Sequence, residues 1–79
     1  MEKIDLLRKA GEALYGERWQ ADMTTALGLG DPRRIRQWLS RSRPIPDGVW
    51  KDLYELLEAR KLNIDLLLKE SEFLEKKDE

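Results

Sequence analysis

The chain has 79 residues, in which 15 lysines and arginines stand against 16 aspartates and glutamates. At this length we expect one domain, spanning residues 1–79, with a small core. Cysteine and histidine are both absent, which excludes disulfides, thiolate or imidazole metal sites and the commonest nucleophile and base pairs of enzymes. No apolar run reaches the roughly 20 residues of a membrane span. The first fifteen residues mix acids with cations, unlike a signal peptide. We therefore expect a cytoplasmic protein that is not an enzyme and that uses no cofactor, metal or small-molecule ligand.

Apolar residues at helical spacing, divided by glycine and proline, predict an all-α fold. Gly16 and Gly28 end the first two helices, and Asp31 caps the third, with Pro32 at its first position. Asp47 and Asn63 are the expected caps of the last two. The predicted architecture is a compact bundle of about five helices, over residues 2–15, 18–27, 32–41, 47–60 and 63–76.

Five arginines lie between residues 31 and 43, where Asp31 is the single acid, so this window carries +4 while the rest of the chain sums to -5. Such a cluster in an otherwise acidic protein is typical of a localised contact with a polyanion, because phosphate attraction acts over about one Debye length. The alternative is a solvated helix face. The use of arginine alone, without lysine, favours directed hydrogen bonding.

The third predicted helix separates its residues into two faces. Rotation by about 100° per residue places Ile35, Trp38 and Leu39 on the inner side. The outer face and its flanks are predicted to carry Arg33, Gln37, Ser40, Arg34, Arg36 and Arg41. Arginine and glutamine can read base edges in a DNA major groove, and flanking arginines can reach phosphates. For Arg43, in the following loop, an ion pair with Asp47 or Asp52 and a contact with the DNA backbone stay equally open.

The run WQADMTTALGLGDPRRIRQWL resembles the helix-turn-helix of the lambda-repressor and XRE-like family. The positions that carry the resemblance are Gln20, Met23, Thr24, Gly28, Ile35 and Trp38. The segment RPIPDGVWKDLYELL resembles a small bacterial and phage branch of these regulators, so that the likeness covers about residues 12–60. The resemblance implies a helix-turn-helix over about 18–41, a phosphate contact by Gln20, and sequence-specific binding to double-stranded DNA. It implies an autoregulating repressor of a small operon. Thr24 stands where the family usually has alanine, and the turn is one residue longer than usual.

The last predicted helix carries more apolar residues than one side of a short helix can turn inward. We expect the excess to form a homodimer that reads an inverted repeat with its recognition helices about 34 Å apart. The expected dimer residues are Ile64, Leu66, Leu67 and Leu68. A different hypothesis is a helical protein-interaction adaptor, in which the arginine-rich third helix meets an acidic partner.

Overall fold

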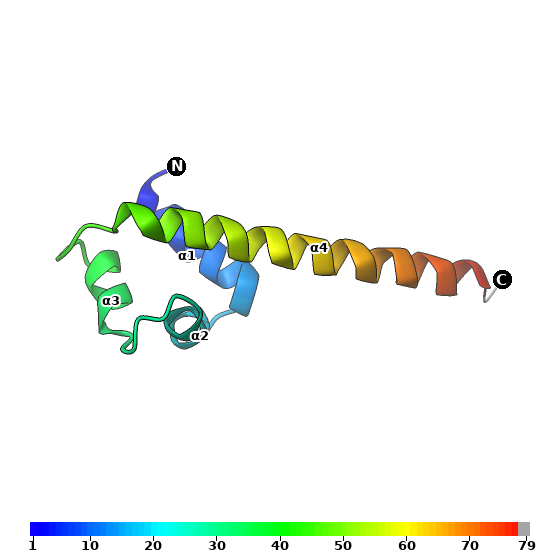
Figure 1. The fold of residues 1–79 in the computed structure, drawn as a ribbon, viewed down its shortest axis with the longest axis horizontal. Helices are drawn as coiled ribbons and strands as arrows, with labels where there is room; N and C mark the ends of the chain where they lie inside the picture. Colours follow the sequence, from blue (N-terminus) through cyan, green and yellow to red (C-terminus); the bar gives the residue numbers. More distant parts are fainter. Residues whose placement is uncertain (78–79) are drawn as a thin grey trace.

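The computed structural model of the chain describes residues 1–77; residues 78 and 79 of the predicted domain lie outside it. The described residues form helices and loops without a strand, which confirms the all-α class. Four helices follow one another along this part of the chain (Figure 1). They are α1 (Lys3–Tyr15), α2 (Trp19–Ala26), α3 (Arg33–Leu39) and α4 (Asp47–Lys77).

One core joins the three short helices to the first turns of α4. Its largest fully buried side chains are Leu7 of α1, Met23 of α2 and Ile35 of α3, and α4 closes it with Val49 and Leu53. We call this part of the molecule, residues 1–57, the head. The first three helices begin and end within two residues of their predicted positions, as expected for elements defined by capping residues and local spacing.

Gly11, in the middle of α1, allows the closest approach between helices in the head. A Cβ atom at this position would overlap the indole ring of Trp19, the first residue of α2. Trp19 is buried as a result, packed directly on the backbone of α1. A residue that weakens the helix in isolation is therefore required by the packing.

The prediction of two separate C-terminal helices is wrong, because residues 47–60 and 63–76 belong to the single helix α4. Neither glycine nor proline occurs between Val49 and Lys77, so nothing breaks the backbone ladder. Asn63 lies inside the helix, where an asparagine costs less than about 0.7 kcal/mol relative to alanine. Asp47 is the first residue of α4, as part of its first turn.

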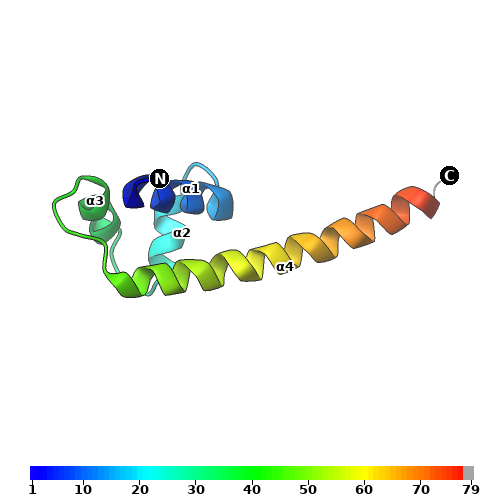
Figure 2. The ribbon, with the colours of Figure 1, turned by 90° about the horizontal axis from the view of Figure 1, so that it is seen from above.

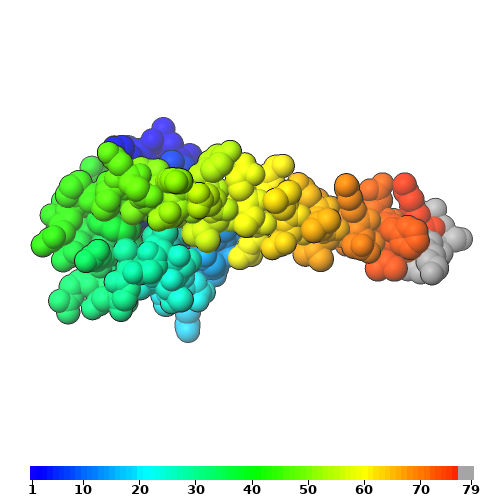
Figure 3. All heavy atoms as spheres, in the orientation of Figure 1, coloured from blue at the N-terminus to red at the C-terminus, as the bar shows by residue number. Residues whose placement is uncertain are grey.

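The molecule is elongated, so the prediction of a compact bundle is also wrong. Its radius of gyration is 15.9 Å, against about 12 Å for a compact domain of this length, and it measures 56 × 21 × 20 Å. Figures 2 and 3 show the cause: α4 continues far beyond the head as a single rod. From Lys61 to Lys76 every side chain of this rod is exposed. Within the described chain no helix combines the length and apolar character that crossing a bilayer requires.

Candidate nucleic-acid interface

The turn between α2 and α3 begins with a glycine in the left-handed region. Gly28 has φ 68°, and its N–H donates to the carbonyl of Thr25 at 3.1 Å. The next N–H, that of Leu29, reaches back to the carbonyl of Thr24 at 3.0 Å. These two bonds form a Schellman motif, which ends the helix sharply and satisfies its last carbonyls. The turn thus redirects the chain toward α3.

The start of α3 is shifted by one residue from the prediction, because Pro32 is the N-cap and Asp31 precedes it. The Asp31 carboxylate accepts a hydrogen bond from the backbone N–H of Arg33 at 2.7 Å. Pro32 has helical dihedrals, and its carbonyl accepts from Arg36 N–H at 3.2 Å. Proline at this position loses no hydrogen bond, because the first N–H groups of a helix have no partner inside the helix.

Thr24 of α2 lies in the buried part of the head. Its hydroxyl donates to the carbonyl of Gln20 at 2.7 Å, one turn earlier, as expected for a threonine inside a helix. Gln20 itself is half-buried in the first turn of α2. A phosphate contact by its side chain stays a prediction.

The two faces of α3 differ sharply in exposure. Ile35 and Trp38 are buried and anchor the helix in the core. Arg33, Arg34 and Arg36 are exposed, and within residues 1–77 none of them forms an ion pair with a carboxylate. The structure therefore brings three uncompensated guanidinium groups together on one rigid helix.

Gln37 is less accessible than its predicted position on the outer face of the helix implies. It is half-buried, because the chain after α3 turns back over the end of the helix. The backbone N–H groups of Ser42 and Arg43 both donate to the Gln37 carbonyl, at 2.9 and 3.3 Å. The Ser40 hydroxyl is also engaged locally, 2.8 Å from the hydroxyl of Ser42. Gln37 lines a shallow hollow of ≈ 410 Å³ together with Arg34 and Arg43.

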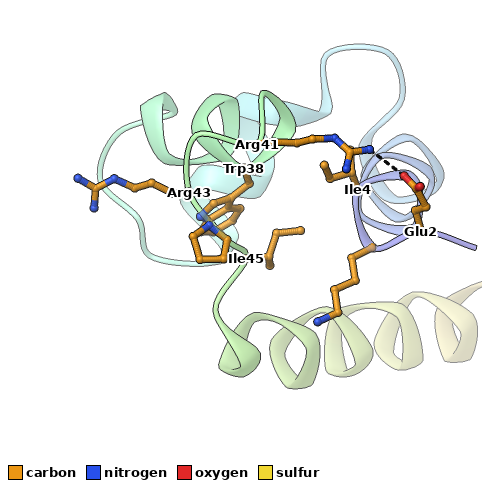
Figure 4. Close-up of a pocket in the computed structure, with 8 residues that line it drawn as sticks. Glu2, Ile4, Trp38, Arg41, Arg43 and Ile45 are labelled. Atoms are coloured by element: carbon orange, nitrogen blue, oxygen red, sulfur yellow. Dashed lines mark hydrogen bonds and ion pairs between the residues drawn. The ribbon is translucent and has the colours of Figure 1, made fainter.

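Arg41 has the one positive φ, 66°, found among the non-glycine residues of the described chain. It takes the place usually held by glycine in a second Schellman motif, in which its N–H donates to the Trp38 carbonyl at 3.2 Å. Its guanidinium donates to the carboxylate of Glu2 at 2.8 Å (Figure 4). Both side chains are exposed. The charge of Arg41 is therefore partly balanced by Glu2.

A second hollow, of ≈ 500 Å³, lies between the beginning of α1 and the loop after α3. Arg41, Arg43 and Lys3 contribute cations to its lining, Glu2 the one acid. Lys3 and Glu2 were not foreseen, because no motif or spacing connects the N-terminus with residues 41–43. Arg43 pairs with neither Asp47 nor Asp52, and in Figure 4 its side chain points away from Glu2 and Arg41.

Other kinds of site find little support in residues 1–77. No group of three or more acidic, histidine or cysteine side chains there could hold a metal ion. The pKa of Tyr54 is raised, because its hydroxyl bonds to the Glu58 carboxylate and the negative charge of Glu58 disfavours ionisation. This pair lies on the exposed surface of α4 and belongs to no cluster of candidate site residues.

The predicted dimer residues all lie on the projecting part of α4. Ile64, Leu66, Leu67 and Leu68 are all exposed. At about 100° per residue, Ile64, Leu67 and Leu68 share one side of the helix, while Leu66 points to the opposite side. The four residues therefore do not form one surface.

Comparison of the chain with protein-family models, with curated proteins and with solved structures finds no match.

Proposed function

We propose that the chain is a sequence-specific regulator that binds double-stranded DNA, with α2 and α3 acting as a helix-turn-helix. The observation that carries this proposal is the set of exposed arginines without a carboxylate partner, Arg33, Arg34, Arg36 and Arg43. Three of them lie on a helix whose other face is anchored by two buried side chains.

The chemistry of this surface suits a duplex. Phosphate attraction supplies affinity, and arginine can grip guanine O6 and N7 with two hydrogen bonds. In the proposed complex α3 lies in the major groove, Arg33 and Gln37 contact bases, and Arg34, Arg36 and Arg43 position the helix against phosphates. Ser40 and Arg41 lie at the C-terminal end of α3, and Gln20 lies at the start of α2. In the proposed complex each of these side chains reaches the DNA backbone.

The resemblance to small bacterial and phage regulators extends the proposal to regulation. The protein would act as an autoregulating repressor of a small operon, as a dimer on an inverted repeat. It would then respond to its own concentration, and it would work in the cytoplasm without a cofactor.

Selection on randomised duplexes, followed by affinity measurements, tests the proposal. Arg33→Ala should cost about 1 to 3 kcal/mol on the selected site and much less on random duplex, because base contacts specify while phosphate contacts position. Arg34→Ala should weaken both duplexes alike. The matched control is Arg8→Ala, which removes an exposed arginine of α1 that is already paired with Asp5 at 3.5 Å and should change neither affinity.

Salt dependence provides the second measurement. Binding to random duplex should fall steeply as salt rises, because neutralised phosphates release counterions. If duplex binding is absent at low salt, while an acidic protein surface binds and Arg33→Ala or Arg36→Ala abolishes that contact, the protein is an interaction adaptor and the DNA proposal is wrong.

A further inference from the structure

The projecting half of α4, residues 61–77, has no support from the rest of the molecule. All its side chains through Lys76 are exposed, although an isolated helix of this length is marginal in water. Ion pairs join Lys61 to Asp65 at 3.4 Å and Lys76 to Glu72 at 3.2 Å, but exposed pairs of this kind stabilise a helix only slightly. The exposed leucines therefore point to a missing partner.

The apolar residues of this half form two stripes on opposite sides of α4. Helical rotation places one stripe within about 80° of Ile64, in line with the buried Val49 and Leu53, and the other 160° or more away. We call the first the core-side stripe and the second the opposite stripe. The core-side stripe contains the apolar residues Ile64, Leu67, Leu68 and Leu74, and on the same side of the helix the polar residues Lys61, Ser71, Glu72 and Glu75; the opposite stripe contains Leu62, Leu66 and Phe73.

We propose that the core-side stripe pairs with the same stripe of a second copy, in antiparallel orientation. The head occupies the same side of α4 as this stripe, since Val49 and Leu53 are buried in its core. Packed helices lie 8 to 10 Å apart, so a parallel pair would force two heads into one space. The projecting half extends beyond the head (Figures 1 and 3), so an antiparallel partner has room to run along it and to end where the head begins.

The available length sets the register of the pair. Full overlap of residues 61–77 with the same segment of a second copy places the two-fold axis at Lys69. Ile64 then lies opposite Leu74 of the second copy, and Leu67 lies opposite Ser71 of the second copy. Leu68 lies beside Leu68 of the second copy. These contacts remove the core-side leucines from water, which favours the pair.

Charged side chains in and beside the stripe distinguish the two orientations. In the antiparallel register Lys61 comes close to Glu75 of the second copy, and this attraction occurs twice. At the exposed rim Glu70 faces its own copy, and Asp65 comes close to Glu72 of the second copy; solvent screens these repulsions. A parallel pair would instead place Arg60 against Arg60 at the same level and bring Glu70 close to Glu75 on both sides.

Sedimentation of the full chain without DNA tests the partner. The unmodified protein should be a dimer at tens of micromolar. Leu67→Asp should give a monomer of 9.3 kDa, whereas its neighbour Leu66→Asp, on the opposite stripe, should stay dimeric. Neither side chain contacts the core, so both variants should keep the far-ultraviolet circular dichroism of a folded head. A monomeric unmodified protein, or the reverse response of the two variants, would overturn the proposal.

Charge exchange and one distance test the orientation. Lys61→Glu and Glu75→Lys should each weaken the dimer, and the double variant should restore it. The chain has no cysteine, so Lys51→Cys can carry a single spin label. The label-to-label distance should be about 54 Å from the helical rise. A much shorter distance, or a double variant weaker than both single ones, would show that the pair is not antiparallel.

The geometry of the dimer also predicts the spacing of the two DNA half-sites, and this prediction rests on the proposed function. Asp47 lies 22 residues before Lys69, so the two beginnings of α4 are about 66 Å apart. Because α3 lies beside the beginning of α4 in both views (Figures 1 and 2), the recognition helices are separated by about two turns of DNA instead of the one turn expected from the sequence.

Affinity for designed inverted repeats tests the spacing. Repeats of the selected half-site with centres two helical turns apart should bind the unmodified protein at least tenfold tighter than repeats one turn apart, and Leu67→Asp should abolish the difference. Tighter binding at one turn would overturn the antiparallel dimer while leaving DNA recognition intact. Absence of any duplex binding from a protein that sediments as the predicted dimer would reject the DNA function alone.

Discussion

Gly11 and Gly48 are both helical glycines, but their surroundings differ. An alanine methyl at Gly11 would overlap the Trp19 ring, whereas a methyl at Gly48 meets nothing within 4 Å. We expect Gly11→Ala to lower the free energy of unfolding by about 1 to 3 kcal/mol through overpacking. Gly48→Ala should raise it by about 0.4 to 1 kcal/mol, because it restricts the unfolded chain. Urea denaturation of both variants measures the contrast; equal effects would refute the close approach.

Arg41 combines a strained backbone with a charged side chain. Its φ of 66° costs a non-glycine residue about 1 kcal/mol, while its exposed ion pair with Glu2 is worth less than that. Arg41→Ala and Arg41→Gly both remove the guanidinium, but glycine alone relieves the strain. The free energy of unfolding should be about 1 kcal/mol higher for the glycine variant than for the alanine variant.

Duplex affinity separates the two roles of Arg41. If its guanidinium reaches DNA, Arg41→Ala and Arg41→Gly should weaken binding equally, regardless of their difference in stability. An alanine variant that binds as the unmodified protein does would remove Arg41 from the interface.

At the scale of elements, the continuity of α4 through Asn63 decides the shape of the molecule. Inside a helix, Asn63→Ala should raise the free energy of unfolding by up to about 0.7 kcal/mol, and the melting temperature should rise slightly with it. At a helix start the same change would remove a cap and cost about 1 kcal/mol. The sign of the change in thermal melts followed by circular dichroism therefore distinguishes one helix from two.

Asn63→Gly is the control for this comparison. Glycine inside a helix costs about 1 kcal/mol relative to alanine, but at a cap it replaces asparagine at a cost of only a few tenths of a kcal/mol. A stability that decreases from alanine through asparagine to glycine at position 63 fits one helix. The order Asn, Gly, Ala would contradict it.

At the scale of the whole molecule, the N-terminus and the loop after α3 meet although 39 residues separate Glu2 from Arg41. The carboxylate of Glu2 pairs with Arg41 and lines the same hollow as Lys3 and Arg43, and it lowers the positive potential of the proposed interface.

Glu2→Gln should tighten binding to random duplex by up to about fivefold, the factor that corresponds to an exposed ion pair of 1 kcal/mol. Titration at low salt measures the effect. The control Glu55→Gln makes the same change in net charge on α4 and should alter affinity much less. Equal gains from both variants would mean that net charge, and not the release of Arg41, governs binding.

Features that depend on neighbouring residues could be predicted from the sequence. The approximate positions of α1, α2 and α3, the hydrogen bond of Asp31 at the start of α3, and the burial of Ile35 and Trp38 all follow from spacing and capping within about ten residues. The exposure of Arg33, Arg34 and Arg36 follows from the same periodicity, because a helix fixes the direction of each side chain relative to its neighbours.

Only the tertiary structure decided what distant segments do to one another. The contact of Gly11 with Trp19 and the ion pair of Arg41 with Glu2 each need two elements whose meeting no periodicity encodes. The partial covering of Gln37 depends on the path of the turn at Ser42 and Arg43, which residue spacing does not encode either. The projection of α4 belongs here too. Its leucines are spaced equally well for packing on the head or for facing outward, and the head is already closed by Val49 and Leu53. The last turns of α4 run on past the head, and their side chains through Lys76 are exposed.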